Sequence, residues 1–446
     1  PALRGGDPPR RISGLICKKY RKGNFLMAKI AIMGFGTVGS GVLEVCRRNA
    51  ASIARRAGEP VEVKYILDVR DFSDSPDAAL FTKSIDTILN DPEVRVVVET
   101  IGGTKFAYPY VRQCLESGRS VCTSNKEMVA TYGAELLALA KEHNVAFLFE
   151  ASVGGGTPII TPMHQCLAAN HISQIQGIVN GTTNYILTRM SKEGAEYADV
   201  LADAQRLGLA EPDPASDVEG LDAAYKLSIL ASLAFHGRVP FENVYVEGIT
   251  QVQAEDIRCG QELGYTLKLL AIAKRDGLNV ETRVHPTFIR NDHPLANISG
   301  AFNAVFLHGH ACGEMMFMGR GAGDLPTASA IVSDLVRAAS AQKHLYPTFD
   351  NELHPAVSLQ NNTDWRCAFY TRMLAKDEPG VLSRIAQTFA DHGVSIAAMQ
   401  QKGEQRDGRV TVVFITHQAS ERDMQKAILE IRPEVATVES LLRVEA

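Results

Sequence analysis

Residues suited to acid–base chemistry gather in one short stretch near the middle of the chain. Glu211 and Asp213 are each followed by a proline, and Asp222 and Lys226 lie a few positions further on. Proline fixes backbone angles and removes an amide donor, so the first two acids are expected on a stiff loop. Asp222 and Lys226 are four positions apart in the helical apolar pattern of residues 220–232, so they share one face. An acid beside an ammonium can bind a polar amino acid and move a proton at neutral pH.

Two simpler interpretations of this stretch stay open. The Asp222–Lys226 pair could be a surface ion pair that contributes little to stability. Asp217 could be a helix N-cap, because aspartate is common just before a periodic apolar run. In the functional interpretation, Glu211 and Asp217 bind the ammonium group of an amino-acid substrate. Lys226 then donates the proton to the reacting oxygen, directly or through a water.

The elements that must position these residues begin with a nucleotide-binding pattern. Residues 29–33 form an apolar strand pattern, and a helix that runs through residue 46 opens with Gly34, Phe35, Gly36, Thr37, Val38 and Gly39. Glycines at this spacing allow a tight turn, close approach of the backbone to a pyrophosphate and close packing of helix on strand. Amide groups at the helix N-terminus supply an anion site. The pattern therefore predicts a dinucleotide-binding unit at the front of the chain.

A second strand, predicted over residues 61–69, bears on the choice of cofactor. Asp68 could bond the ribose hydroxyls of NAD, whereas Arg70 could hold the additional phosphate of NADP. Arg70 could equally be a solvated surface arginine. The sequence therefore leaves NAD and NADP open.

Two more predicted strands, residues 94–99 and 120–123, end in polar and glycine-rich segments. Thr100, followed by Gly-Gly at 102–103, comes after the first of them, and Lys126 comes after the second. Ligands bind at the carboxyl ends of strands in open α/β sheets. Lys126 is therefore predicted to contact the cofactor or a substrate oxygen, with helix capping as the alternative.

The end of the chain has the pattern of a small separate unit. From residue 365 it predicts strand (367–373), helix (382–392), strand (396–402), strand (409–416), helix (421–430) and strand (437–444). This β-α-β-β-α-β order is the ferredoxin-like arrangement. A polar bridge, residues 336–363, precedes it.

Length, composition and charge bound the remaining possibilities. The chain has 446 residues, 45% of them hydrophobic, which is enough for two or three globular domains. A formal net charge of -5 gives no electrostatic reason to expect nucleic acid, and no apolar run reaches the length of a membrane span. The eight scattered cysteines are typical of a reduced, cytoplasmic protein. Residues 1–26 are basic and rich in Pro and Gly, and are predicted to be a poorly ordered extension.

Several longer motifs, in a fixed order along the chain, resemble the homoserine dehydrogenase family. They are GFGTVG (34–39), SNK (124–126), EASVGGGTPII (150–160), NGTTNYIL (180–187), LGLAEPDPASDVEGLDAAYKLSIL (207–230) and GRGAGDLPTASAIVSDL (319–335). The resemblance implies NAD- or NADP-dependent interconversion of L-homoserine and L-aspartate 4-semialdehyde, in the biosynthesis of threonine and methionine. It also implies a homodimer or homotetramer built through the middle domain, and the form without a fused kinase.

The resemblance also implies a role for individual residues. Lys226 corresponds to the catalytic lysine, Asp222 to its carboxylate, Glu211 to a substrate ligand and Lys126 to a second lysine in the site. Backbone contacts to the nicotinamide end are implied for Gly208, Gly321 and Gly323. A sodium ion is implied at four residues, namely Glu150 and the carbonyls of Val153, Gly155 and Thr157, although this glycine-rich run could simply be a hinge.

The C-terminal unit resembles an ACT domain through the text DEPGVLSRIA and FADHGVSI. Asp377 and Gly380 then fall on the ligand loop, which implies feedback inhibition by threonine. A dimerisation module without a ligand is the alternative.

The predicted fold class is therefore α/β. It combines a Rossmann-type NAD(P)-binding domain, an α+β substrate and dimerisation domain, and a C-terminal ferredoxin-like ACT domain. The expected bounds are 1–26 for the extension, 27–155 for the first domain (completed by about 319–350), 156–335 for the second, 336–363 for the linker and 364–446 for the third.

Other functions need different chemistry. A non-catalytic regulator that senses a dinucleotide and an amino acid would not need Glu211, Asp222 and Lys226 together. Aspartate-semialdehyde dehydrogenase would need a nucleophilic cysteine, and neither Cys122 nor Cys166 has a histidine partner placed by a motif. His308 and His310 are compatible with a metal but have no third ligand nearby, so they are expected to be packed or exposed.

Overall fold

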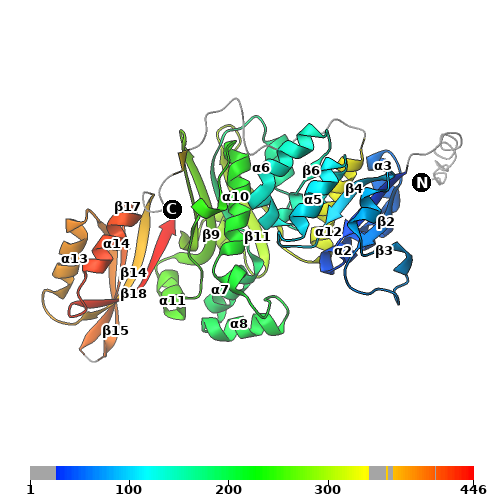
Figure 1. Ribbon diagram of the computed structural model, residues 1–446. Helices are drawn as coiled ribbons and strands as arrows, with labels where there is room; N and C mark the ends of the chain where they lie inside the picture. The colour runs from blue at the N-terminus through cyan, green and yellow to red at the C-terminus, as the bar shows by residue number, and fades with distance from the viewer. Residues whose placement is uncertain (1–26, 341–357, 360–364, 407, 446) are drawn as a thin grey trace, which may run out of the picture.

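The computed structural model describes residues 27–340, 358–359, 365–406 and 408–445. The predicted extension (1–26) and most of the predicted linker (336–363) lie outside the described residues. Three units follow one another along the molecule, in the order of the chain (Figure 1). The first is an α/β unit, the second a large mixed sheet with helices, and the third the small C-terminal unit.

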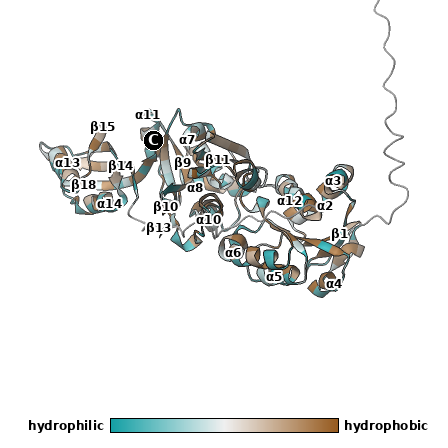
Figure 2. Cartoon of the chain, turned by 90° about the horizontal axis from the view of Figure 1, so that it is seen from above, coloured by the Kyte–Doolittle hydropathy of each residue, from teal (hydrophilic) through white to brown (hydrophobic). Residues whose placement is uncertain are grey.

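The first unit contains a sheet of six strands in the order β3-β2-β1-β4-β5-β6, and each neighbouring pair is parallel. Its strands are β1 (Ala28–Met33), β2 (Val61–Leu67), β3 (Phe81–Thr82), β4 (Val94–Glu99), β5 (Ser120–Thr123) and β6 (Phe147–Leu148). Its helices are α2 (Thr37–Arg48), α3 (Ala50–Ala57), α4 (Ile85–Leu89), α5 (Ala107–Glu116) and α6 (Lys126–Glu142). Central strands such as β1 and β4 are apolar along nearly their whole length, as is typical of parallel strands covered on both faces (Figure 2). The predicted Rossmann-type arrangement is confirmed.

The chain returns to this first sheet after the middle unit. Helix α12 (Asp324–Ala339) packs against α2 so closely that a side chain on Gly41 would lie 3.0 Å from the carbonyl oxygen of Asp324. The buried residues of α12 belong to the same apolar cluster as β1 and α2. The helix ends four residues beyond residue 335, the predicted end of the middle domain. The exact domain bounds stay a prediction.

The middle unit is built on a mixed sheet. Its main strands are β7 (Ile172–Ile178), β9 (Tyr265–Asp276), β10 (Asn279–Arg290), β11 (Phe302–Gly309) and β12 (Gly313–Arg320), in the order β12-β11-β7-β9-β10. Short strands β8 (Tyr245–Val246) and β13 (Ser358–Leu359) also pair with β10. The helices are α7 (Gly181–Glu193), α8 (Tyr197–Arg206), α9 (Ala215–Val218), α10 (Leu221–Phe235) and α11 (Ala254–Glu262). A π-helical turn (Pro162–Cys166) and short 3-10 turns complete the unit.

The C-terminal unit has the predicted β-α-β-β-α-β order. Its elements are β14 (Arg366–Lys376), α13 (Val381–Asp391), β15 (Ile396–Arg406), β16 (Arg409–Thr416), α14 (Glu421–Glu430) and β18 (Ala436–Glu445), with a short β17 (Ala419–Ser420) before α14. Its strands are not a separate sheet. The last strand, β18, pairs with β10 near Thr287, so the two sheets form one continuous sheet. The sequence did not predict this pairing.

A cluster of buried charges holds the C-terminal unit to the middle sheet. Arg443 of β18 is buried and bonds the carboxylates of Glu421 (2.6 Å) and Glu247. Arg283 of β10 is also buried and bonds Glu445, which accepts a second bond of 2.8 Å from Lys274. The guanidinium of Arg283 lies 4.5 Å from the centre of the Trp365 ring, so that tryptophan packs at the junction. We call these residues the junction cluster.

Two smaller predictions have different outcomes. A group of methionines such as those at 315, 316 and 318 is expected to fill a core beside a strand. Met315 is partly buried and packs against the core, but Met316 and Met318 are 41% and 52% exposed. They lie on one face of β12, the last strand of its sheet, which nothing described covers. His308 and His310 are exposed, as expected, and they bond Ser173 and the backbone of His171.

Candidate active site

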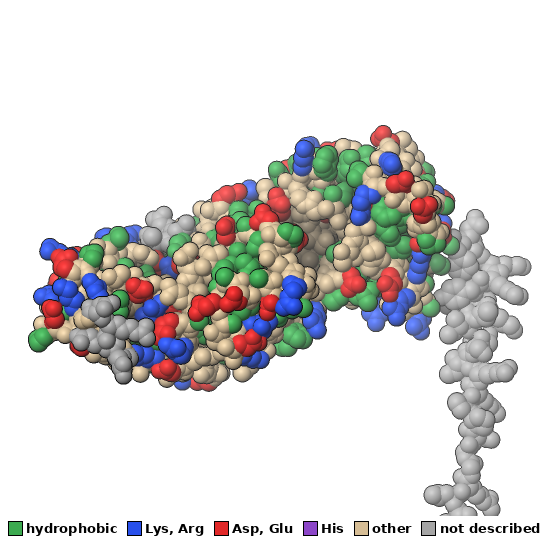
Figure 3. Space-filling model, turned by 90° about the horizontal axis from the view of Figure 1, so that it is seen from below, with side chains coloured by type: hydrophobic (Ala, Val, Ile, Leu, Met, Phe, Trp, Pro, Cys, Tyr) green, Lys and Arg blue, Asp and Glu red, His purple; other side chains and the backbone are tan. Residues whose placement is uncertain are grey.

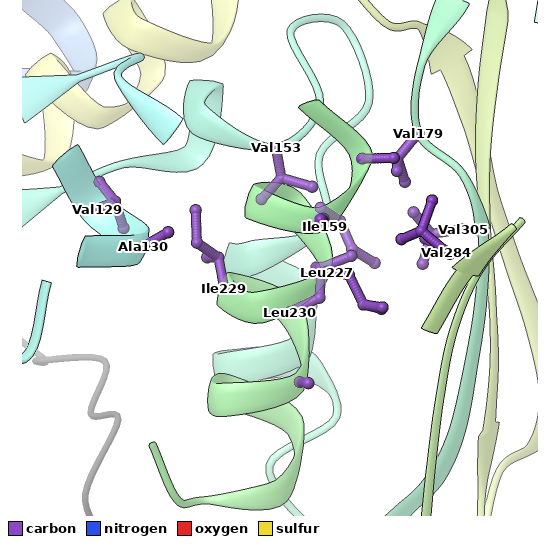
Figure 4. Close-up of a cluster of buried hydrophobic side chains, with 14 of the residues drawn as sticks. Val129, Ala130, Val153, Ile159, Val179, Leu227, Ile229, Leu230, Val284 and Val305 are labelled. Carbon is purple, nitrogen blue, oxygen red and sulfur yellow. The ribbon is translucent and has the colours of Figure 1, made fainter. Parts of the chain in front are cut away.

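The helix that carries Lys226 is held between the first two units. Helix α10 is almost entirely buried. Its apolar side chains meet α6 on one side and the middle sheet on the other, with Ile229 on the side of Val129 and Ala130, and Leu227 on the side of Val284 and Val305 (Figure 4). Gly220 precedes α10 with φ +87°, a conformation that glycine adopts without strain. The predicted helix is confirmed, and it lies where the two units meet.

Asp222 is the centre of the site. It lies in the first turn of α10 and is buried. One carboxylate oxygen is 2.6 Å from the Nζ of Lys126 and the other is 2.7 Å from the Nζ of Lys226. Lys226 also donates to the carbonyl oxygen of Val179 (2.8 Å). A surface ion pair is therefore the wrong interpretation, because one buried acid joins two lysines from different units.

The two lysines differ in their proton affinity. Burial, reinforced by the charge of Lys126, outweighs the attraction of Asp222 and lowers the pKa of Lys226. Lys126 is more exposed; burial also opposes its charge, but the charge of Asp222 wins and raises the pKa of Lys126. Burial favours the neutral acid at Asp222, yet the two lysines hold its pKa well below the usual range. Of the two lysines, Lys226 is therefore the one whose protonated form its surroundings disfavour.

A polar cavity of about 370 Å³ lies beside this cluster. Four predicted site residues line it, namely Thr100 and Lys126 from the first unit and Glu211 and Asp217 from the second. The other lining residues are Gly102, Gly103, Ser124, Asn125, Glu127, Asp213 and Ser216. Predicted Gly208, Gly321 and Gly323 do not belong to this lining. The surface is visibly hollowed between the two larger units, and acidic and basic side chains are intermixed on the face shown (Figure 3).

Asp217 is not an N-cap. It lies inside the short helix α9, whose N-cap is Pro214, while the N-cap of α10 is Gly220. Its carboxylate accepts a 2.7 Å bond from the side-chain amide of Asn180. That amide also donates to Asp222. Sequence reasoning missed Asn180, although its place between an apolar strand and a helix was a signal.

Glu99 was also missed. It is the last residue of β4, is fully buried, and accepts backbone N–H groups of Ile101 (2.7 Å) and Gly102 (3.2 Å) and the hydroxyl of Thr123. Burial raises the pKa of Glu99. Its carboxylate thus fixes the loop that lines the cavity. An acid at the end of an otherwise apolar strand was the available signal.

The glycine-rich turn has the shape of a dinucleotide cradle. A side chain on Gly39 would lie 2.1 Å from the carbonyl oxygen of Gly34, whereas one on Gly36 would meet only open space. Gly36 therefore leaves its backbone accessible, and Gly39 permits the close turn. Asp68 accepts the amide of Phe35 (2.7 Å) and pairs with Arg70 (2.9 Å). These residues fit NAD or NADP as the bound group.

The segment predicted to hold sodium is buried and rich in oxygen atoms. Both carboxylate oxygens of Glu150 accept backbone N–H groups, from Ile159 (2.6 Å), Ile160 (2.8 Å) and Thr161 (2.7 Å). The buried hydroxyl of Thr157 has no hydrogen-bond partner within the described residues. A hard monovalent cation fits such oxygen donors. In the described part of the chain, no three His, Cys, Asp or Glu residues are grouped for a metal.

The predicted effector residues lie on one loop of the C-terminal unit. Asp377 follows β14 and is exposed, with its amide bonded to the carbonyl oxygen of Gly408 (3.0 Å). Gly380 is the N-cap of α13 with φ +85°. The loop thus opens onto a helix as predicted.

The parallel sheet, its glycine cradle and the adjacent lysine–aspartate cluster define a nicotinamide-dependent oxidoreductase. Residues 34–150 match the family model described as "Homoserine dehydrogenase, NAD binding domain", residues 158–336 match "Homoserine dehydrogenase", and residues 369–433 match "ACT domain". The chain belongs to the homoserine dehydrogenase family.

Similar proteins cover nearly the whole chain. Homoserine dehydrogenase of Bacillus subtilis is 42% identical over 429 residues, which is 94% of this chain and 98% of that protein. Homoserine dehydrogenase of Corynebacterium glutamicum is 40% identical over 426 residues, 93% and 95% of the two chains. The crystal structure of a homoserine dehydrogenase from Thiobacillus denitrificans superposes with a TM-score of 0.88 at 41% identity, covering 94% of this chain and 98% of that one.

The chain therefore has NAD(P)-dependent homoserine dehydrogenase activity in the biosynthesis of aspartate-family amino acids, as predicted. The ACT domain at its C-terminus is confirmed as well. The alternative function, a non-catalytic regulator, is therefore wrong. The cysteine mechanism also loses its support at Cys122, because burial raises the pKa of that thiol well above its ordinary value. None of the helices in the described residues combines the length and apolar character needed to cross a membrane.

Proposed function

We propose that homoserine binds in the cavity beside Lys126, with its ammonium group at Glu211 and Asp217 and its reacting oxygen at the lysines. The single observation that carries this proposal is the bond of one buried carboxylate, Asp222, to Lys126 and Lys226 at the edge of that cavity. A nicotinamide cofactor, when bound, supplies or accepts the hydride. The protein has to bind the amino acid, stabilise negative charge on the oxygen and move one proton.

The two lysines have different roles, one in charge stabilisation and the other in proton transfer. Lys126 lines the cavity and stays protonated, so its ammonium stabilises the alkoxide-like oxygen in the transition state. Lys226 lies outside that lining, behind Asp222, so it gives its proton to the oxygen through a water during reduction of the semialdehyde. In homoserine oxidation the neutral Lys226 takes the proton back. Asp222 keeps both lysines in place in either direction.

Substrate binding is tested at Glu211. Replacing Glu211 with Gln removes a negative charge that would face the substrate ammonium, so the KM for homoserine should rise about tenfold with a smaller change in kcat. Glu219→Gln is the matched control, because Glu219 is also exposed and lies outside the lining of the cavity. An unchanged KM in Glu211→Gln would remove this residue from the binding site.

We propose that Asp68 and Arg70 together set the choice of cofactor. In the described structure Asp68 holds Arg70, and the hydrogen bonds that Arg70 donates lower the pKa of Asp68 to about 2. An ionised Asp68 favours the ribose hydroxyls of NAD and repels a 2′-phosphate, whereas a released Arg70 would bind that phosphate. A hyperthermophilic archaeal homoserine dehydrogenase, 30% identical with a TM-score of 0.60, has been solved in complex with NADPH. We therefore propose that both cofactors bind, with NAD favoured.

The cofactor proposal predicts opposite effects of two changes. In Asp68→Asn, the ratio of kcat/KM for NADP to that for NAD should rise by about tenfold, since the repelling charge is gone. In Arg70→Ala, the same ratio should fall. If neither variant changes the ratio, the pair does not set the preference.

We propose that threonine inhibits the enzyme by binding at the loop of residues 377–380. An exposed acid at the start of a loop, followed by the amides at the N-terminus of α13, suits the two charges of a free amino acid. Asp377→Ala should raise the threonine concentration for half-inhibition at least tenfold while uninhibited activity stays normal. Asp391→Ala, at the other end of the same helix, is the control. If threonine does not inhibit the wild-type enzyme, the alternative of a dimerisation module without a ligand is favoured.

We propose that the enzyme is a homodimer or homotetramer and works in the cytoplasm. The exposed face of β12, which includes Met316 and Met318, supports an association of the middle units. Replacing both methionines with lysine should lower the mass measured by sedimentation. Leu429→Lys is the control, because Leu429 is 83% exposed on α14. An unchanged mass in the methionine variant would place the interface elsewhere.

We propose that a sodium ion binds at Glu150 with backbone carbonyls of Val153, Gly155 and Thr157, where it would hold the segment between the first two units. Support comes from the unpartnered Thr157 hydroxyl and from the bond of the Gly155 amide to Gly321 (3.0 Å), next to α12. Sodium chloride should raise the thermal midpoint more than choline chloride at equal ionic strength. Equal effects of the two salts would contradict the site.

A further inference from the structure

We infer that Asn180 is a positioning residue that joins the substrate-binding carboxylate Asp217 to the lysine-bearing carboxylate Asp222. Asn180 lies between β7 and α7, and its side chain is buried. Its amide nitrogen donates to Asp217 (2.7 Å) and to Asp222 (2.8 Å). The inference rests on the roles proposed above for those two acids.

The orientation of the Asn180 amide is set by its other end. Its Oδ1 accepts the backbone N–H of Thr183 (2.8 Å), as the N-cap of α7. A backbone N–H can only donate, so the atom that faces it must be the oxygen. The nitrogen with its two hydrogens therefore faces the two carboxylates. Each hydrogen satisfies one acid, and no donor capacity is left over.

A neutral donor suits this position better than a charged one. Two carboxylates held close together repel each other, and a bridging amide offsets that repulsion without adding a charge. The residue before it, Val179, accepts a bond from Lys226 through its carbonyl oxygen. The backbone and side chain of two successive residues thus hold Lys226 and its carboxylate partner in one arrangement.

This arrangement spans the two ends of the proposed substrate. Asp217 would bind the ammonium group, and Asp222 holds Lys126, which would face the reacting oxygen, and Lys226, which would reach it through a water. Asn180 therefore keeps the two binding points at a constant separation, as proximity-based catalysis requires. The titratable groups that face Lys226 are Asp222 on its own helix, Lys126 from α6 and Asp217 from α9. A charge introduced at position 180 would act on all of them.

The decisive variant is Asn180→Asp. It keeps the size and the N-cap acceptor, because aspartate caps helices as well as asparagine does. It replaces two donor hydrogens with a third negative charge beside Lys226. A nearby opposite charge favours the protonated lysine. The midpoint of the pH profile of kcat/KM for homoserine oxidation should therefore move up by about one pH unit, and kcat/KM near pH 8 should fall about tenfold.

Thr183→Ala is the matched control. The Thr183 hydroxyl also bonds Oδ1 of Asn180 (2.9 Å) but touches neither acid in the described structure. Its loss should lower stability slightly and leave the pH profile unchanged. If Asn180→Asp folds poorly, Asn180→Ser provides the second measurement, because serine caps the helix but cannot reach both acids. In that variant the KM for homoserine should rise at least fivefold.

The possible results separate the two levels of the proposal. A normal pH profile and a normal KM in the Asn180 variants, with a wild-type enzyme that oxidises homoserine, would overturn the positioning role alone. Full activity in Lys226→Ala would instead overturn the proposed function of the lysines. Both kinds of variant are measured by the formation of reduced nicotinamide cofactor during homoserine oxidation.

Discussion

Two groups of buried charges in this molecule, the lysine–aspartate cluster at the cavity and the junction cluster, contain different cations. At the cavity the buried cation is Lys226, and its pKa is lowered. At the junction the buried cations are Arg283 and Arg443; burial opposes their charge, but neighbouring glutamates raise the pKa of both. A lysine can lose its proton in such a place, whereas an arginine does not. Burial of charge is therefore common to both clusters, and only one of them can carry out proton transfer.

The two groups also differ in their surroundings. At the cavity, Asp222 bonds Lys126, and Lys126 lines a space of about 370 Å³. In the junction cluster each described arginine is matched to carboxylates and stacked against the rings of Trp365 or Tyr245. Such an arrangement fixes the geometry of the two arginines. We therefore propose that the first group carries out chemistry and that the second holds the C-terminal and middle units together.

The largest expected effect comes from the same substitution at one lysine of each group. Lys226→Met should lower turnover by roughly 10²–10⁴-fold, the usual contribution of a general acid, with little change in cofactor affinity. Lys274→Met removes a lysine that bonds Glu445 at the junction, and turnover should stay within twofold. Steady-state kinetics and a cofactor titration of both variants check this. Equal losses in the two variants would remove the distinction between the groups.

The next effect concerns stability. Arg443→Met leaves the buried carboxylate of Glu421 without its cation, so the free energy of unfolding should fall by about 3–5 kcal/mol. Arg290→Met, which breaks an exposed pair with Asp292, should change it by less than about 1 kcal/mol. Denaturant unfolding of both proteins gives the numbers. If the two substitutions cost the same, the junction cluster is not a stabilising contact.

A smaller effect tests whether partners, and not burial alone, decide the protonation of a buried acid. Asp334 is as buried as Asp222 but pairs with the partly exposed Arg337 (3.2 Å) in place of two lysines; burial and the charge of Glu150 raise its pKa to about 7. The stability that this group contributes is fully present below its unfolded pKa and is lost as pH rises through about 7. In Asp334→Asn, the loss of stability between pH 5 and pH 8 should therefore be smaller than in the wild type. Parallel curves would contradict the raised pKa.

The sequence predicted the elements with strong apolar patterns. Strands β4 and β5 begin and end at the predicted residues because apolar runs there are bounded by polar or glycine residues. The carboxylates and lysines of the cavity were also found, since glycine and proline placed them at strand ends and helix starts. Asn180 was missed because its role depends on Asp217 and Asp222, which are distant in the chain. Glu99 was missed although its partners Ile101 and Gly102 are local, because an acid that ends a strand can equally face solvent. The junction cluster was missed for the reason that applies to Asn180, since Arg283 and Glu445 come from different units.

The pairing of β18 with β10 means that the ACT unit is not an appendage that can be excised neatly. Cutting the chain before residue 365 would remove hydrogen bonds from one edge of the middle sheet. It would also leave the buried Arg283 without the carboxylate of Glu445. A shortened enzyme that is inactive or aggregates would then report damage to the substrate unit and reveal little about effector control. Single substitutions in the exposed loop of residues 377–380 therefore test effector control more directly than a truncation does.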